Sequence, residues 1–405
     1  MRGRAAQPRR GHLPGRAPEP EARELRRLVP ATCGVGARRT IVTGPLRPTL
    51  DASVYLDEPA WLAERERIWF GQWILVGRAE DVPDPGDRLV ADVAGESVLI
   101  VRDDEDDLHA FANVCRHRGA QLVDPSGPAC GNVGAMIRCP YHAWSYGYDG
   151  ALRRAPFLDA AALPDIHLAT WSVDTWGGFV FVHAGEPGTS LSDQLGAVVD
   201  RTVRYPLAQL RRGVTLTYEV AANWKILAEN YNECYHCGPV HPELCDLVPL
   251  FRRGGGGLDW PDGIPHRDGA WTFTTTGTTT RQPFPGLDDA ELVRHKGELV
   301  YPNLLLSLSA DHVAAFRLAP RGPGATTVIC DLLFHPDAIS ADDFDPSDAS
   351  ELWDLVNRQD WAICESVQRG MQSRSWQGGW FAPMEDDAAD IAVWYERAMR
   401  QAGAP

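Results

Sequence analysis

Apolar residues recur at helical spacing in the stretch NWKILAENYNECYHCGPVHP, which covers residues 223–242. The positions at steps of three and four are Trp224, Leu227 and Tyr231. They predict an amphipathic helix, for which Asn223 is a suitable N-cap. We expect this helix to end at Gly238 and Pro239, because proline lacks an amide hydrogen and glycine suits the capping turn.

A second helical pattern covers residues 350–371, SELWDLVNRQDWAICESVQRGM. At about 100° per residue its apolar positions fall in one narrow stripe. That stripe consists of Leu352, Val356, Ile363, Val367 and Met371. Asp360 lies in the middle of the stripe. The other acidic residues of the helix point elsewhere, namely Glu351, Asp354 and Glu365.

The part of the chain from residue 51 to residue 114 predicts one helix followed by short strands. The helix is expected to turn four side chains inward, Trp61, Leu62, Ile68 and Trp69. A strand follows it, and then three alternating runs that are separated by turn residues, DRLVADVAG, ESVLIVRD and LHAFANV. Alternation with period two is typical of half-buried strands, so this region is β-rich.

Later runs predict an antiparallel sheet. They are TLTYEV at 215–220, GAWTFTTTG at 269–277 and LLLSLSADHVAAFRLA at 304–319. Together with the helices, these runs predict an α+β fold.

Composition and charge narrow the class of protein. The 405 residues allow two or three domains, and the net charge of −16 makes nucleic acid an unfavourable partner. Residues 1–40 hold ten arginines against three glutamates, so we exclude them from the fold as a disordered basic extension. No run is long and apolar enough for a membrane helix, and the start lacks the order of a signal peptide. Nine scattered cysteines indicate reduced thiols, some of them ligands, in a cytoplasmic protein without a membrane partner.

Two histidines and a carboxylate converge at the end of the first helix, with the spacing Glu233-x2-His236-x4-His241. They are either capping and core polar residues or a metal site, since imidazole is a common ligand of borderline metals. The spacing alone does not name the metal.

A second constellation lies upstream and reads Cys115-Arg116-His117, twenty-one residues, then Cys139-Pro140-Tyr141-His142. Each limb offers one thiolate and one imidazole, whereas structural zinc sites usually pair like with like. Mixed limbs suit a two-iron two-sulfur cluster in which one iron has two cysteines and the other two histidines. A zinc ribbon or a chance pair of loops is the alternative.

A buried carboxylate without a partner costs several kcal/mol, so Asp360 needs a cation or a donor nearby. A buried salt bridge is one answer. The other is a metal, because His236 and His241 lack a third ligand. The three residues then form a two-histidine one-carboxylate site that leaves positions open for dioxygen.

The motifs VCRHRGA and CPYHAWSY closely resemble the Rieske domain of the large subunits of Rieske non-haem iron oxygenases. The resemblance extends over nearly all of residues 50–400. One departure is Ala143, where the family usually carries glycine. If that position needs positive φ, alanine strains the loop.

The resemblance implies two domains: a β-rich Rieske domain at 76–186, and a helix-grip catalytic domain, an antiparallel sheet with helices, formed by 41–75 and 187–405. In the first it implies a 2Fe-2S cluster on Cys115, His117, Cys139 and His142. In the second it implies a mononuclear Fe(II) on His236 and His241, to which the match of QDWAICESVQRG adds Asp360. Glu233 matches the carboxylate that bridges to a Rieske histidine of the neighbouring subunit, by residue match His142, which implies a homotrimer.

The same resemblance implies an oxygenase that uses dioxygen and electrons from a separate NAD(P)H-dependent reductase or ferredoxin. The sequence ENYNECYHC is similar to the corresponding motif in the branch of the family that acts on small quaternary ammonium compounds such as glycine betaine, carnitine and choline. Hydroxylation of an N-methyl group would release formaldehyde. Such a cation should lie against aromatic side chains, for which the candidates are Trp271, Phe273, Trp376 and Trp380. Dihydroxylation of an aromatic acid is the alternative, and a zinc protein is the alternative from another class.

Overall fold

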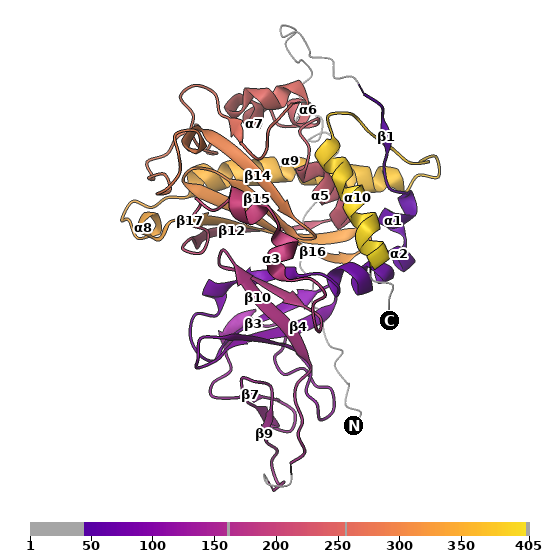
Figure 1. Cartoon of the computed structure of the whole chain (residues 1–405), viewed down its shortest axis with the longest axis vertical. Coiled ribbons are helices and arrows are strands. Elements are labelled where there is room, and N and C mark those ends of the chain that lie inside the picture. The colour runs from indigo at the N-terminus through magenta and orange to yellow at the C-terminus, as the bar shows by residue number, and fades with distance from the viewer. Residues whose placement is uncertain (1–43, 160–162, 256, 402–405) are drawn as a thin grey trace, which may run out of the picture. The chain divides into compact units, whose positions relative to one another are not determined.

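The computed structural model describes residues 44–159, 163–255 and 257–401. The predicted basic extension at 1–40 lies outside the described residues. Figure 1 shows the chain as β-rich segments in indigo and magenta, followed by strands and long helices in orange and yellow. This order confirms the α+β prediction.

The first large sheet has seven antiparallel strands in the order β2-β11-β10-β5-β4-β3-β6. Their bounds are β2 Ile74–Arg78, β3 Asp87–Val93, β4 Glu96–Arg102, β5 Leu108–Ala112, β6 Cys130–Asn132, β10 Thr170–Trp176 and β11 Phe179–His183. The strands predicted from the three alternating runs are β3, β4 and β5, and all three are confirmed. A small sheet packs with it and consists of β7 Ile137–Arg138, β8 Ser145–Tyr146 and β9 Leu152–Arg154.

The second large sheet has six antiparallel strands in the order β12-β17-β16-β15-β14-β13. Their bounds are β12 Arg211–Val220, β13 Ile264–Pro265, β14 Arg294–Val300, β15 Leu304–Leu308, β16 His312–Gly322 and β17 Ala325–Phe334. The predicted strands at 215–220 and 304–319 are confirmed, the latter as the hairpin of β15 and β16.

The predicted strand at 269–277 is wrong. This segment forms tight turns, in which the Thr274 hydroxyl donates to the carbonyl of Thr278 (2.8 Å) and the Gly277 amide donates to the carbonyl of Thr274 (3.1 Å). Gly277 has φ +82°, which an extended strand does not accommodate. Threonine hydroxyls that bond nearby backbone groups compete with a strand ladder, and a run of threonines conceals this competition in the sequence.

Three helices form the other layer of this region: α5 Trp224–Tyr231, α9 Ser347–Met371 and α10 Asp386–Gln401. Helix α5 contacts both α9 and α10, and Figure 1 shows α9 running across the six-stranded sheet. The shorter elements are β1 Arg47–Pro48, α1 Ala52–Leu56, α2 Glu58–Glu64, α3 Leu191–Leu195, α4 Val198–Arg201, α6 Cys237–Val240, α7 Pro242–Leu247, α8 Pro336–Ile339 and β18 Trp380–Phe381. Within the described part of the chain, none of the helices has the length and apolar character needed to cross a membrane.

The helix boundaries differ from the prediction at two places. Asn223 caps α5 as expected, its side chain accepting the amide of Lys225, but α5 ends at Tyr231 and not at Gly238. A separate turn, α6, contains Gly238. The expected helix near residue 60 is divided into α1, α2 and a π-helical turn at Arg65–Trp69, and Leu62 is exposed rather than buried.

The inward face of α9 is rotated from the predicted stripe. Ile363 and Val367 are exposed, while the buried positions are Ala349, Leu352, Trp353, Val356, Asn357, Cys364, Gln368 and Met371. Some positions on this buried face are occupied by polar side chains, because these side chains find hydrogen-bond partners there. Gln368, for example, accepts the amide of Asn223 through its Oε1 atom (2.9 Å). Asp360 still lies toward the inside.

A buried ion pair joins three of these elements. Lys225 on α5 lies 2.6 Å from Glu64 on α2, and both side chains are almost completely buried. The carboxylate of Glu64 accepts two further hydrogen bonds, from Trp224 Nε1 (2.9 Å) and from the hydroxyl of Tyr395 on α10 (3.0 Å). A charged pair in such a place is tolerable because its hydrogen-bonding capacity is filled.

Candidate active site

A cavity of about 580 Å³ opens between α5, α9, α10 and β14. Its wall contains the predicted site residues Glu233, His236, His241 and Asp360. Among the described residues, His236, His241 and Asp360 form the one group of three potential ligands whose donor atoms lie within 4.8 Å of one another. The structure therefore brings together the three residues that the sequence proposed as a triad.

The two histidines point the same ring nitrogen at one carboxylate oxygen. Asp360 Oδ1 lies 3.2 Å from His236 Nε2 and 2.9 Å from His241 Nε2. The other ring nitrogens are engaged elsewhere: Nδ1 of His236 contacts Glu233 Oε1, and Nδ1 of His241 lies 2.7 Å from Gln359 Oε1. Oxygen acceptors at both Nδ1 atoms allow these atoms to keep their protons when a metal replaces the protons at Nε2, as in metal-binding histidines.

The electrostatics of the group fit a cation. Burial alone would lower the pKa of His236, but hydrogen bonds to Asp360 and Glu233 raise it to about 11. Burial alone would raise the pKa of Asp360, but the neighbouring His241 and His236 hold it well below its usual range. A carboxylate kept ionised beside two imidazoles is the donor set of a two-histidine one-carboxylate metal site.

Local structure explains how these side chains meet. His236 and His241 are the residues that precede α6 and α7, so the break after α5 swings both back toward α9. Gln359, beside Asp360 on α9, orients His241, and Glu243 in turn accepts the Gln359 amide (3.2 Å). Sequence reasoning missed Gln359. Its partner is more than a hundred residues away in the chain, so spacing carried no signal.

The four residues of the upstream constellation form two side-chain pairs, with a clear asymmetry. Cys115 and Cys139 are buried and their side chains interact, whereas His117 and His142 are exposed, with ring centroids 4.7 Å apart. A cluster held here would have its thiolate side inside and its imidazole side at the surface. This arrangement suits a 2Fe-2S group whose histidine-ligated iron exchanges electrons with an outside partner.

Two aromatic residues that follow the second limb support the first limb. His117 stacks on Trp144 with a centroid distance of 4.6 Å and an interplanar angle of 8°. The hydroxyl of the fully buried Tyr146 lies 3.2 Å from Cys115 Sγ and accepts the amide of Arg116 (3.1 Å). Groups of this kind around the sulfur atoms and imidazoles fix ligand orientation and tune the cluster.

Ala143 has φ +59°, which confirms the suspected need for positive φ at this departure from the family. We expect Ala143→Gly to stabilise the Rieske loop by about 0.5–1 kcal/mol, because removing the left-handed strain outweighs the added freedom of the unfolded chain. The measurement is the temperature at which the visible absorbance of the cluster is lost. Ala120→Gly, at a position outside the left-handed region, is the control and should lower that temperature; an equal rise in both variants would contradict the explanation.

The predicted aromatic cage is largely wrong. Of the four candidates only Phe273 lines the cavity, while Trp271 and Trp376 are half-buried elsewhere and Trp380 is exposed on β18. The aromatic side chains that do line it are Tyr231, Phe251, Trp260, Phe273, Tyr301 and Trp353. Trp260 packs over β14 at Gly297, where an added Cβ would lie 3.3 Å from the indole. Trp353 and Asp360 lie two turns apart on the same face of α9, the face that lines the cavity. This helical spacing is present in the sequence, so Trp353 could have been found from it.

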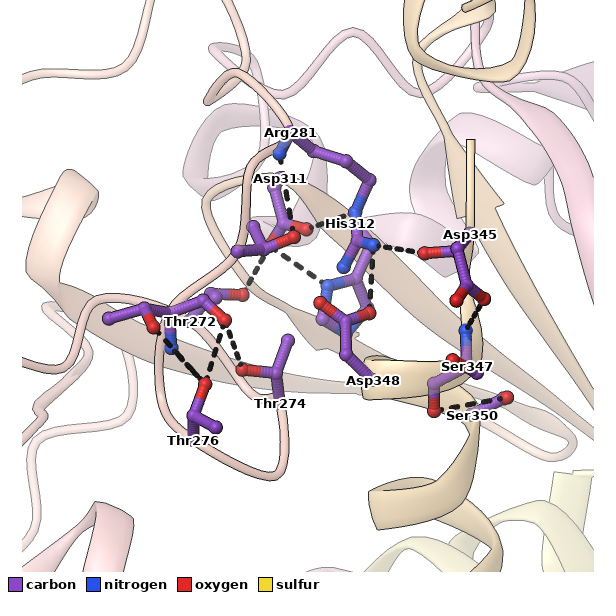
Figure 2. A network of polar contacts seen from close by, with 12 residues as sticks. Thr272, Thr274, Thr276, Arg281, Asp311, His312, Asp345, Ser347, Asp348 and Ser350 are labelled. Carbon is purple, nitrogen blue, oxygen red and sulfur yellow. Dashed lines mark hydrogen bonds and ion pairs between the residues drawn. The ribbon is translucent and has the colours of Figure 1, made fainter. Parts of the chain in front are cut away.

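Trp353 is fixed by a buried polar network at the start of α9, part of which Figure 2 shows. Arg281 Nε donates to Asp311 (2.9 Å), and another of its nitrogens donates to Asp348 on α9 (2.8 Å). His312 Nδ1 lies 2.9 Å from Asp311, and His312 Nε2 accepts the indole N–H of Trp353 (3.1 Å). The network thus sets the position of one wall of the cavity.

Comparison with known proteins decides the family. Residues 72–172 match the family described as Rieske [2Fe-2S] domain, and residues 207–401 match Ring hydroxylating alpha subunit (catalytic domain). The chain belongs to the Rieske non-haem iron oxygenases. A Rieske oxygenase is an oxidoreductase that holds a 2Fe-2S cluster and a mononuclear iron and receives its electrons from a reductase. This confirms the predicted family, fold and cofactors.

Two relatives and one solved structure show which members of the family the chain is similar to. A glycine betaine monooxygenase oxygenase subunit from Chromohalobacter salexigens is 29% identical over 385 residues, which cover 87% of this chain and 86% of the relative. A carnitine monooxygenase oxygenase subunit from Acinetobacter baumannii is 29% identical over 336 residues, covering 80% and 85%. The crystal structure of the quaternary ammonium Rieske monooxygenase CntA with inhibitor MMV12 superposes with a TM-score of 0.71 at 26% identity, covering 88% and 96%.

Proposed function

We propose that this Rieske oxygenase hydroxylates an N-methyl group of a small quaternary ammonium compound. One oxygen atom of dioxygen enters the C–H bond and the other leaves as water, with two electrons and two protons supplied from outside. The hydroxymethyl ammonium then loses formaldehyde and a proton to give the demethylated amine. The cavity carries this proposal, because it joins six aromatic side chains to the group of His236, His241 and Asp360. The names of the relatives support the substrate class.

Two sets of side chains would hold the metals. We assign the cluster to Cys115, His117, Cys139 and His142, and the mononuclear iron to His236, His241 and Asp360. The iron, when bound, supplies the reductive activation of dioxygen. The residues around it position the ligands: Glu233 and Gln359 hold the two Nδ1 protons, which keeps both Nε2 atoms directed at one point.

The aromatic wall binds and orients the substrate. A methylated ammonium is attracted to aromatic rings and pays little for leaving water, because it donates no strong hydrogen bonds. Phe273 and Trp353 pack edge to face with centroids 5.7 Å apart, and the ring centroids of Phe251 and Trp260, elsewhere on the wall, lie 5.9 Å apart. These rings exclude water and hold one methyl group toward the triad.

The experiment that tests the function combines the purified enzyme with a compatible reductase and NADH. Methylated ammonium compounds should support oxygen consumption with release of formaldehyde, and aromatic acids should not. Turnover of aromatic acids to cis-diols, with no response to any methylated ammonium, would replace the proposal with aromatic ring dioxygenation.

Glu233 is the residue through which we propose that electrons reach the catalytic site. Its carboxylate contacts His236 within the chain, and the neighbouring Tyr235 is exposed, as is His142 in the Rieske domain. In a homotrimer, Glu233 would join His236 to His142 of the partner subunit. An NAD(P)H-dependent reductase or ferredoxin reloads the cluster. A reducing compartment such as the cytoplasm suits the described cysteines, which form no disulfide.

Glu233→Gln should slow reoxidation of the reduced cluster in a single turnover by about 10–100-fold, because the neutral amide lacks the charge that aligns both histidines. Both metals should stay bound. Glu351→Gln, which removes an exposed carboxylate from α9, should leave the rate unchanged. An unchanged rate in the Glu233 variant would contradict the bridging role.

A further inference from the structure

The charges along the cavity wall are strongly one-sided. Six carboxylates line it, Glu233, Asp259, Glu298, Asp360, Asp387 and Asp390. Arg201 is the single arginine or lysine among the described residues that line it. Glu298 already holds this arginine with two hydrogen bonds of 2.6 Å. The charge of this arginine is thus already balanced by Glu298, so the pair as a whole offers no net positive charge to a second carboxylate.

The uncompensated carboxylates lie at the rim. Asp387 and Asp390 are exposed, one turn apart on α10, and Asp259 is exposed on the loop before Trp260. Their effect is visible on Tyr301, whose pKa is raised by burial and by the negative charges of Asp390 and Asp387. A rim with this field attracts cations and repels anions over about one Debye length.

The interior offers polar groups that carry no charge. His295 on β14 is about 4% exposed and lines the cavity. Burial, followed by the neighbouring His266 and His312, holds its pKa well below the usual range, so the ring is neutral. Tyr231 and Ser307 add a pair of hydroxyls 3.0 Å apart. These groups suit a hydroxyl, which both donates and accepts.

We propose that the substrate is a monocation, a methylated ammonium whose second polar group is a hydroxyl that His295 binds, and not a zwitterion with a carboxylate. The inference rests on the proposed function and goes beyond it by naming the charge of the substrate. A carboxylate brought into this cavity would pass three like charges and find no free cationic side chain among the described wall residues. An unpaired anion that loses its water is strongly disfavoured.

The test compares choline with glycine betaine, which share a trimethylammonium group and differ in the hydroxyl or carboxylate end. Isothermal titration calorimetry on the holoenzyme should give a dissociation constant at least about tenfold lower for choline, and reductase-coupled oxygen consumption should give the same order in kcat/KM. Added salt should weaken choline binding more than glycine betaine binding, since it screens the attraction of the rim.

Two variants locate the effect. Asp387→Asn with Asp390→Asn should reduce the preference for choline several-fold, whereas Asp386→Asn, which removes a charge from the same helix outside the cavity wall, should change it less. His295→Leu should abolish the difference in affinity between choline and tetramethylammonium, which lacks the hydroxyl, and His295→Gln should restore part of it.

The possible outcomes distinguish a failure of this inference from a failure of the proposed function. Binding of glycine betaine as tight as that of choline, or tighter, would overturn the inference and leave the proposed function standing. A choline preference that survives both the double and the His295 substitutions would also overturn it. No binding and no turnover with any of the three ammonium compounds would overturn the proposed function itself.

Discussion

Asp360→Ala should lower turnover by at least about 100-fold and remove the iron of the catalytic site, while the visible and electron paramagnetic resonance spectra of the Rieske cluster stay intact. Loss of a residue that only orients a ligand already costs about 10–100-fold in metal affinity or activity, so loss of a ligand should cost no less. Asp360 Oδ1 is the atom on which both Nε2 atoms converge. Its removal leaves two neutral imidazoles and no anionic donor.

The measurement pairs activity with iron and acid-labile sulfide analysis of the same preparation. Glu351→Ala, an exposed carboxylate on the same helix, is the control and should keep both metals and full activity. If Asp360 were only the anion of a buried salt bridge, the variant would lose stability but keep its iron. Full retention of catalytic iron would therefore remove Asp360 from the ligand set.

Glu64→Ala should lower the free energy of unfolding of the catalytic domain by about 3–5 kcal/mol, because it leaves the Lys225 ammonium buried without its counter-charge. Lys225 is fully buried, and burial lowers its pKa although Glu64 acts in the opposite direction. The same substitution also strands the indole N–H of Trp224 and the hydroxyl of Tyr395. Urea denaturation followed by tryptophan fluorescence measures the change.

Two further variants show whether the stranded charge is the cause. Glu64→Leu combined with Lys225→Met should recover the part of the loss that comes from the stranded ammonium, since an apolar pair of similar volume replaces a buried ion pair at little cost. Glu66→Ala removes an exposed carboxylate two residues further along the chain. It should change the free energy of unfolding by less than about 0.5 kcal/mol. Equal destabilisation by the single and double variants would assign the loss to packing and to the two stranded donors instead of the charge.

The ligand-bearing segments could be predicted because each is local in the chain. Cys115 and His117 are two residues apart, Cys139 and His142 three, and His236 and His241 five, so their proximity follows from short backbone segments. Asp360 was the exception. It was found because the period of α9 turns it to the inside, and this holds although the predicted stripe was wrong at Ile363 and Val367.

The residues that shape the cavity could not be predicted in the same way. Phe251 lies on a short 3-10 helix at Pro249–Arg253 and Trp260 in a turn, so neither belongs to a periodic pattern. By residue type alone, Trp376 and Trp380 were equally good candidates for the cavity wall. Whether an aromatic side chain faces a cavity depends on which distant elements pack against its own. The same holds for Gln359, which orients His241 across 118 residues of sequence.

By itself, then, the sequence determined the α+β class, most of the strands, the kinds of metal donor and their grouping into two sets, since these depend on composition and on spacing within one turn or one loop. The tertiary structure alone decided which aromatic side chains and which charges surround the space beside Asp360. It did so because side-chain direction at a cavity is set by long-range packing, in which α10, β14 and α9 are brought together from the last third of the chain.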